Sequence, residues 1–139
     1  MFKIYTLIIT AAAFGVSGCA TQPVATTDAA PVPPERILAS EFLKPGGEAG
    51  IVTVKRDSGL FGSGCSARLF VNAKPTAELR PSERITLYLP LGEHILSAQP
   101  TGMCGGGLVE VKANVGRQPT TFRMGAGTNG DFILVPTAF

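Results

Sequence analysis

The sequence predicts an all-β domain, a small antiparallel β-sandwich of about seven strands. Three observations predict this fold: the 139 residues include 17 glycines and 11 prolines, tryptophan is absent, and no long stretch keeps a helical spacing of apolar residues. Short runs rich in β-branched residues alternate instead with clusters of turn-forming residues. A chain of this length has room for one small domain with a single core.

The first 18 residues are of a different kind and are excluded from the fold. Lys3 is followed by an apolar run over residues 4–14, too short for a comfortable transmembrane helix, and then by small residues. The run Val16-Ser17-Gly18-Cys19 resembles the lipobox of bacterial lipoprotein signals. The resemblance implies cleavage before Cys19, transfer of a diacylglycerol to its sulfur, and a stable lipid anchor. The resemblance also implies an anchor in the outer membrane, because alanine stands at position 20 in place of the aspartate that commonly retains such lipoproteins at the inner membrane.

Residues 19–34, which comprise the lipidated Cys19 and the segment after it, are predicted to be a flexible tether. Residues 20–34 contain four prolines, one charged residue and no aromatic residue, so they cannot form a core. As an extended chain they would hold the domain up to roughly 45 Å from the lipid surface, although a bound role for the segment stays open. The domain is then expected over residues 35–139, where residues 35–43 suit either a helical turn or an irregular strand.

The candidate strands follow one another at short intervals. The clearest is 108–115, where apolar residues alternate with charged or amide ones. The cluster at 56–59 is interpreted as a break after the first strand. The strand at 94–98 is expected to pair with the preceding one, because only a short turn with proline and glycine separates them. In order, the candidates are 51–55, 65–71, 76–79, 84–89, 94–98, 108–115, 118–124 and 132–137.

Part of this pattern resembles PEGA-type β modules. The resemblance rests on LFVNAK at 69–74, AEL at 77–79 and ITLYLPLGEHIL at 85–96, and it extends over residues 50–124. It implies a surface β module of the bacterial envelope and no catalysis. The pair Asn72-Ala73 departs from the usual Asp/Asn-Gly of these modules, which leaves the type of the first turn open.

Few side chains suit catalysis or metal binding. The single histidine, His94, would need a nucleophile and an orienting carboxylate nearby to act as a general base, and the sequence places neither there. The cysteines lack zinc-type spacing, and the glycine-rich stretch 102–107 lacks the ending of a phosphate loop. The balance of 12 basic and 10 acidic side chains indicates no nucleic-acid partner. We therefore expect no catalytic residue, metal, cofactor or small-molecule substrate.

Cys65 and Cys104 are predicted to form a disulfide. Export would place both thiols in an oxidising compartment, Cys19 would be used for the lipid, and a glycine beside each of the two cysteines allows close backbone approach. The bond would join the glycine-rich loops 59–64 and 102–107 into one rigid end of the sandwich. The alternative, two reduced cysteines that are buried separately, stays open.

That end of the sandwich is the expected contact surface. Leu60, Phe61 and Met103 are candidates for contact with a partner, although Leu60 and Phe61 also suit packing back over the core. The sequence thus predicts a non-enzymatic envelope module, anchored to the outer membrane through Cys19, facing the periplasm and bound to another envelope protein. The alternative function is a lipoprotein inhibitor or immunity protein that blocks a periplasmic enzyme; a hydrolase ranks third.

Overall fold

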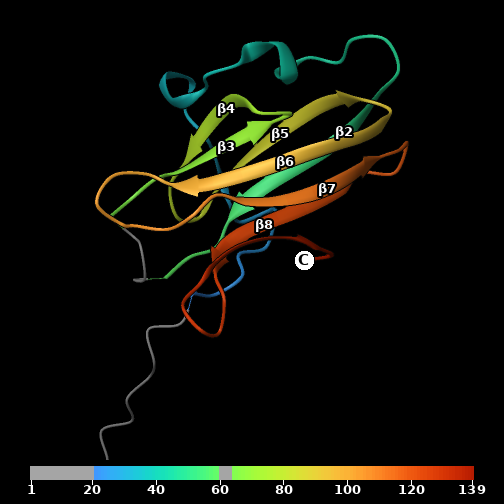
Figure 1. The fold of residues 1–139 in the computed structure, drawn as a ribbon. Helices are drawn as coiled ribbons and strands as arrows, with labels where there is room; N and C mark the ends of the chain where they lie inside the picture. Colours follow the sequence, from blue (N-terminus) through green and yellow to red (C-terminus); the bar gives the residue numbers. More distant parts are fainter. Residues whose placement is uncertain (1–20, 60–63) are drawn as a thin grey trace, which may run out of the picture.

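A computed structural model describes residues 21–59 and 64–139, which form a sandwich of two β-sheets (Figure 1). One sheet has the strand order β1-β5-β2-β8-β9 and the other β4-β3-β6-β7, so the predicted all-β sandwich is confirmed. Among the described residues, no helix is long and apolar enough to span a membrane. The strands are Ala30–Pro31 (β1), Ala49–Arg56 (β2), Ala67–Val71 (β3), Lys74–Leu79 (β4), Glu83–Pro90 (β5), Gly92–Pro100 (β6), Val109–Val115 (β7), Thr120–Ala126 (β8) and Phe132–Thr137 (β9).

Strand β2 lies at the centre of the first sheet. It pairs antiparallel with β5 and parallel with β8, while β8 and β9 are antiparallel. The β2–β8 pair departs from the purely antiparallel arrangement expected from the sequence, because the chain visits the second sheet before it returns as β8. As an interior strand, β2 is buried over residues 52–56, and this places its charged residues inside the protein.

Strand β6 does not pair with β5, so the expectation for residues 94–98 is wrong. It pairs with β3 and β7 in the second sheet, whereas β5 belongs to the first. The chain passes from one sheet to the other at Gly92, whose φ is 127°, a conformation that glycine adopts at little cost. Leu87, Leu89 and Leu96 are fully buried in one core. The two strands therefore bury their apolar faces from opposite sheets instead of lying side by side.

The core lies between the two sheets and follows the predicted alternation of side chains. On β3, Ala67, Leu69 and Val71 are buried, whereas Arg68 and Phe70 are partly exposed. Both sheets contribute to the same cluster, whose other members include Val52, Val54, Ile85, Leu87, Leu89, Leu96, Ala98, Ala113, Phe122, Met124 and Leu134.

Residues 21–34 are bound along the first sheet, so the expectation of a flexible tether is wrong for them. Strand β1 pairs with β5, and the amides of Ala30 and Val32 donate to the main-chain oxygens of Ser82 and Arg84 at 2.9 Å each. Val32 is 5% exposed and belongs to the core. The segment cannot build a core alone, but the edge of β5 supplies hydrogen-bond partners and apolar surface to it.

Two short 3₁₀ helices, Pro34–Arg36 (η1) and Ser40–Leu43 (η2), follow the bound segment. For residues 35–43 the sequence was compatible with either a helical turn or an irregular strand, and the structure has helical turns there. Between them the amide of Leu38 donates to the main-chain oxygen of Thr76 on β4 at 2.8 Å. This contact covers part of the outer edge of β4, which reduces the edge available for pairing with another chain.

The hairpin between β3 and β4 turns at Asn72 and Ala73, whose φ angles are 49° and 66°. Positive φ at both central residues is typical of a type I′ turn. The Asn72 side chain holds this turn: its Oδ1 accepts from the Ile95 amide at 2.9 Å, and its Nδ2 donates to His94 Nδ1 at 2.9 Å. Ala73 has no such support, and a left-handed conformation costs an alanine about 1–2 kcal/mol.

We expect Ala73→Gly to raise the free energy of unfolding by about 0.5–1 kcal/mol, because glycine removes the clash of the Cβ atom at positive φ but adds freedom to the unfolded chain. The midpoint of urea unfolding measures the change. Ala30→Gly is the matched control: φ at Ala30 is not positive, so this change should lower the midpoint. A lower midpoint for Ala73→Gly as well would contradict the assignment of strain to the turn.

Candidate functional site

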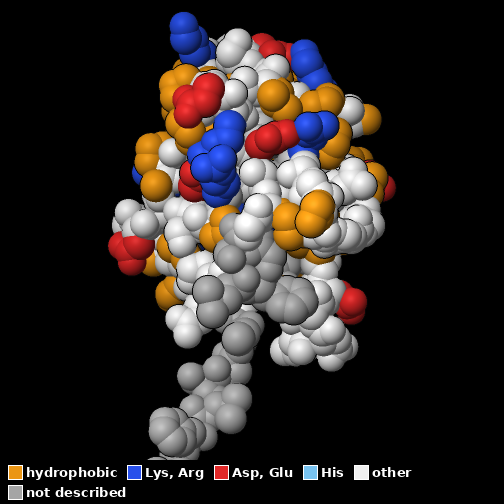
Figure 2. Space-filling view, turned by 90° about the vertical axis from the view of Figure 1, so that its left-hand side faces the viewer, with side chains coloured by type: hydrophobic (Ala, Val, Ile, Leu, Met, Phe, Trp, Pro, Cys, Tyr) orange, Lys and Arg blue, Asp and Glu red, His pale blue; other side chains and the backbone are white. Residues whose placement is uncertain are grey.

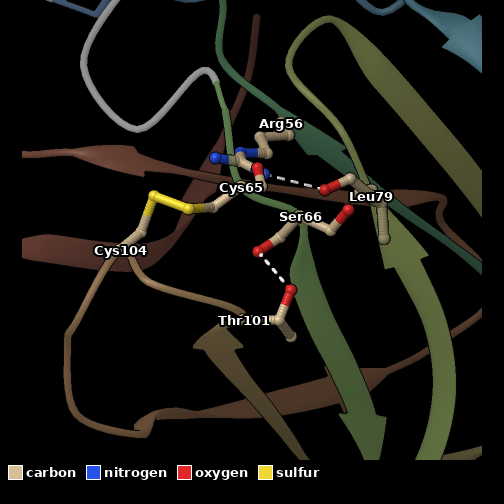
Figure 3. The surroundings of a disulfide bond; sticks show 6 residues. All are labelled: Arg56, Cys65, Ser66, Leu79, Thr101 and Cys104. Atoms are coloured by element: carbon tan, nitrogen blue, oxygen red, sulfur yellow. Dashed lines mark hydrogen bonds between the residues drawn. A yellow bond between two sulfur atoms is a disulfide. The ribbon is translucent and has the colours of Figure 1, made fainter.

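The disulfide between Cys65 and Cys104 is present, with 6.0 Å between the two Cα atoms (Figure 3). It joins the residues before β3 to the loop between β6 and β7. Next to it, the amide and the Oγ1 hydroxyl of Thr101 both donate to the main-chain oxygen of Ser66, at 2.8 and 3.0 Å. The bond confirms the predicted pairing and ties the loop to the start of β3.

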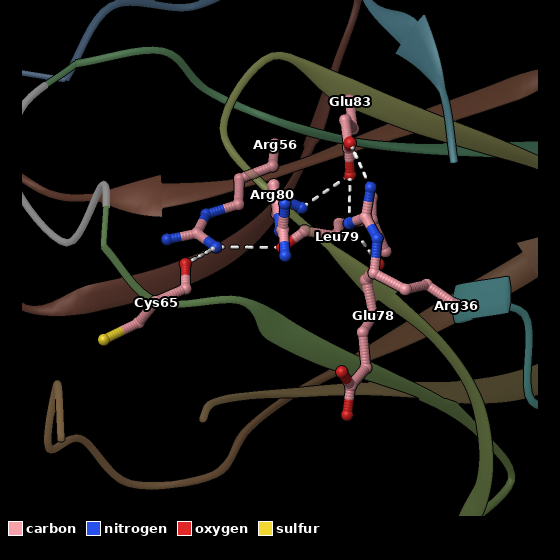
Figure 4. A network of polar contacts seen from close by, with 7 residues as sticks. All are labelled: Arg36, Arg56, Cys65, Glu78, Leu79, Arg80 and Glu83. Atoms are coloured by element: carbon pink, nitrogen blue, oxygen red, sulfur yellow. Dashed lines mark hydrogen bonds and ion pairs between the residues drawn. The ribbon is translucent and has the colours of Figure 1, made fainter. Parts of the chain in front are cut away.

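The side chain of Arg56, at the end of β2, ties the first sheet to the second (Figures 3 and 4). Its Nη1 donates to the main-chain oxygens of Cys65 at 2.5 Å and of Leu79 at 2.9 Å. The residue is only 6% exposed, and this burial lowers the pKa of the guanidinium. One cation therefore holds the chain before β3 and the end of β4 against β2, directly beside the disulfide.

Lys55, the residue before Arg56 on β2, is also buried. Its ammonium donates to the main-chain oxygens of Val24 and Phe139 and lies 5.2 Å from the centre of the Phe139 ring. Burial lowers the pKa of this lysine. Lys55 thus fastens the N-terminal bound segment and the residues after β9 to the central strand.

Asp57 follows directly and is 2% exposed. Its Oδ2 accepts from Arg123 Nη1 at 2.5 Å, but its Oδ1 is buried without a hydrogen-bond partner. Burial raises the pKa of this carboxyl against the opposing effect of Arg123. Gly125 leaves room for the carboxylate, because a Cβ there would lie 2.6 Å from Asp57 Oδ2.

A cavity of about 340 Å³ opens at this end of the sandwich. The disulfide loop forms one wall through Cys104 and residues 105–107. Asp57 and Arg56 also line the cavity, and apolar surface comes from the ends of the neighbouring strands β6 to β9: Pro100, Val109, Ala126 and Phe132. A cavity of this size with apolar walls and a few polar groups has the character of a small binding site.

The sequence analysis missed the three buried charges of residues 55–57 and the cavity beside them. The composition of residues 56–59 is typical of a turn, and the chain does leave β2 there. The burial of Arg56 and Asp57 depends on strands that are distant in the sequence, such as β4 and β8. No local signal in the sequence indicates such partners.

Of the other predicted site residues, the structure places one. Met103 is fully exposed in the loop that carries Cys104, and its contact with a partner stays a prediction. Cys19, Leu60 and Phe61 lie outside the described residues, so lipidation and the contacts of the other loop stay predictions.

His94 is a structural residue at the type I′ hairpin. Its Nδ1 accepts from Asn72, and its Nε2 donates to the main-chain oxygen of Pro90 at 2.8 Å. Both ring nitrogens are therefore engaged in the fold. Within residues 21–59 and 64–139, no group of three or more metal-ligating side chains comes together.

Figure 2 shows one face of the molecule, on which charges of both signs are mixed. A network of charges also forms at η1: Arg36 Nη1 lies 2.6 Å from Glu83 Oε2, which also accepts from the amide of Arg80 at 2.7 Å (Figure 4). Arg36 Nη1 donates in addition to the main-chain oxygen of Glu78 at 3.1 Å. The network attaches η1 to β4 and β5 and needs no external partner.

Comparison with family models, with curated proteins and with solved structures gave no match. The class of protein is therefore defined by its fold and its site: a disulfide-linked β-sandwich with a cavity at the disulfide end.

Proposed function

We propose that this chain is a non-enzymatic, lipid-anchored module of the bacterial cell envelope, which contacts an envelope protein through the end of the sandwich that carries the disulfide. The observation that supports it best is the Cys65–Cys104 bond. Disulfides persist in oxidising compartments such as the periplasm, and this pairing leaves Cys19 for the lipid. Met103 is fully exposed beside the bond and supplies apolar contact area to a partner.

The bound N-terminal segment shortens the distance between the lipid and the domain. The hydroxyl of Thr21 donates to the main-chain oxygen of Ala126 at 2.8 Å, and Thr21 lines the cavity. Thr21 is two positions after an anchor at Cys19, a reach of about 7 Å, far below the roughly 45 Å of a free tether. The anchor would hold the cavity end close to the membrane, so the partner is expected at the membrane surface.

Cys19→Ser should abolish lipidation and leave an unprocessed precursor in a bacterial host, because serine has no thiol to accept the diacylglycerol. Incorporation of labelled palmitate and the mobility of the protein on a denaturing gel measure both effects. Cys104→Ser is the matched control, since it removes a cysteine outside the lipobox and should be processed normally. Normal processing of the Cys19 variant would reject the anchor.

The partner is tested by crosslinking in intact cells, followed by purification of the tagged lipoprotein. A stoichiometric envelope component is expected. Met103→Glu should weaken recovery of this component, whereas Leu91→Glu should not, because Leu91 precedes β6 and Pro100, which lines the cavity, lies at the opposite end of that strand. Recovery of a soluble or secreted enzyme would favour the inhibitor or immunity function instead.

A further inference from the structure

A residue that lines the cavity at the disulfide end has an acceptor that the fold leaves unused. Asp57 lines the cavity and is 98% buried, and its Oδ1 has no hydrogen-bond partner. A buried carboxylate oxygen without a donor is costly, and folded proteins rarely keep one unless a ligand, an ion or a water molecule serves it. Asp57 is thus a candidate for binding a donor group in the cavity.

A second carboxylate lines the same cavity. Asp131 precedes β9 and is exposed, and within the described residues its side chain takes part in no ion pair. Arg56 also lines the cavity, but its Nη1 is directed to the main-chain oxygens of Cys65 and Leu79. The carboxylates of Asp57 and Asp131 are therefore the acidic side chains among the described residues that line the cavity, next to apolar walls.

The disulfide loop, which forms one wall of the cavity, is able to adjust. The amides of Gly105, Gly106 and Gly107 make no backbone hydrogen bond within residues 21–59 and 64–139. Because Oδ1 of Asp57 is itself closed to solvent, an entering group must shift the wall by a small amount. A loop held by the disulfide but free of internal hydrogen bonds permits such a shift at low cost.

From these features we propose that the cavity binds a primary ammonium group on a short apolar stem, as in a lysine side chain presented by the partner. The ammonium donates to Asp57 Oδ1 and is attracted by Asp131, and the butyl stem packs on Val109 and Phe132. The apolar walls favour a lysine stem over the polar phosphate of an ethanolamine lipid head group. The inference rests on the proposed function for the source of the lysine, but its ligand chemistry is tested separately.

The test uses the purified mature protein without the lipid and four probes: Nα-acetyl-lysine amide, butylammonium, ethanolamine and butyrate. Chemical shifts of the amides of Val109, Gly125 and Phe132 report occupation of the cavity during titration. We expect the lysine derivative and butylammonium to bind with a Kd of about 1 mM or tighter, ethanolamine at least about 10-fold more weakly, and butyrate not at all. Ethanolamine binding as tightly as the lysine derivative would overturn the lysine assignment, and butyrate binding would overturn the site.

Two variants localise the binding. Asp57→Asn should weaken binding of the lysine derivative by about 10-fold or more, the range of a charge-assisted hydrogen bond. Asp131→Asn, which alters an exposed residue, should weaken this binding about 3-fold. Glu48→Gln is the matched control and should change nothing, because Glu48 precedes β2 while Asp57 follows it at the opposite end. If Asp57→Asn does not fold, unchanged binding to Asp131→Asn would still overturn the proposal. Binding here without recovery of a partner in cells would reject the proposed function alone.

Discussion

Replacing Cys65 and Cys104 together by serine should lower the free energy of unfolding by about 4 kcal/mol. The bond joins residues that are 39 positions apart, and the loss of chain entropy in the unfolded state for a loop of this length has about that value. The expected stability of a small domain is only about 5–15 kcal/mol. Urea unfolding of the oxidised protein and of the double variant measures the difference.

Reductant provides the control for this prediction. With the bond reduced, the wild-type protein should unfold at nearly the same urea concentration as the double variant, because serine and reduced cysteine are close in size. A difference below about 1 kcal/mol between the oxidised protein and the double variant would show that the bond adds little.

Arg56→Met is expected to lower the free energy of unfolding by about 2–5 kcal/mol. The main-chain oxygens of Cys65 and Leu79 lose the donor that serves them both, and a buried acceptor without a partner costs about 1–3 kcal/mol. Methionine fills much of the space of the arginine stem, so the change tests the guanidinium and not the packing. Chemical unfolding of the purified variant measures the loss.

Arg117→Met is the matched control for Arg56→Met. The Arg117 side chain is 86% exposed and lies 3.7 Å from Glu48, and an exposed pair of this kind contributes little. The free energy of unfolding of the Arg117→Met variant should stay within about 0.5 kcal/mol of the wild-type value. Equal stability of the two variants would mean that the bonds of Arg56 to Cys65 and Leu79 contribute nothing net.

Strands such as β3 were predictable because apolar residues recur at every second position, and β2 was predictable from its run of β-branched residues. Residues such as Leu69 and Val71 alternate with polar or mixed positions, and burial follows that alternation. The disulfide was predictable from the inferred compartment and the even number of remaining cysteines. The turn at Asn72 was located from the sequence, but its positive φ angles were not, since the usual glycine is missing.

The sequence did not predict which strands lie next to each other or which groups pair with the buried charges. A short turn before β6 suggested a hairpin with β5, yet a sheet change at Gly92 lets both strands bury apolar faces in one core. Residues 21–34 cannot form a core of their own, yet they pack on the domain because β1 pairs with the edge of β5. Neither outcome has a signal in the local sequence.

By itself, the sequence predicted the all-β class and the positions of most strands from local residue patterns, and it predicted the pairing of Cys65 with Cys104 from the inferred compartment and a count of cysteines. Only the tertiary structure decided which strands are neighbours, that residues 21–34 are bound, and that Lys55, Arg56 and Asp57 are buried around a cavity. The physical reason is that desolvation and hydrogen bonding of these groups depend on partners from distant parts of the chain, which meet only when both sheets have formed.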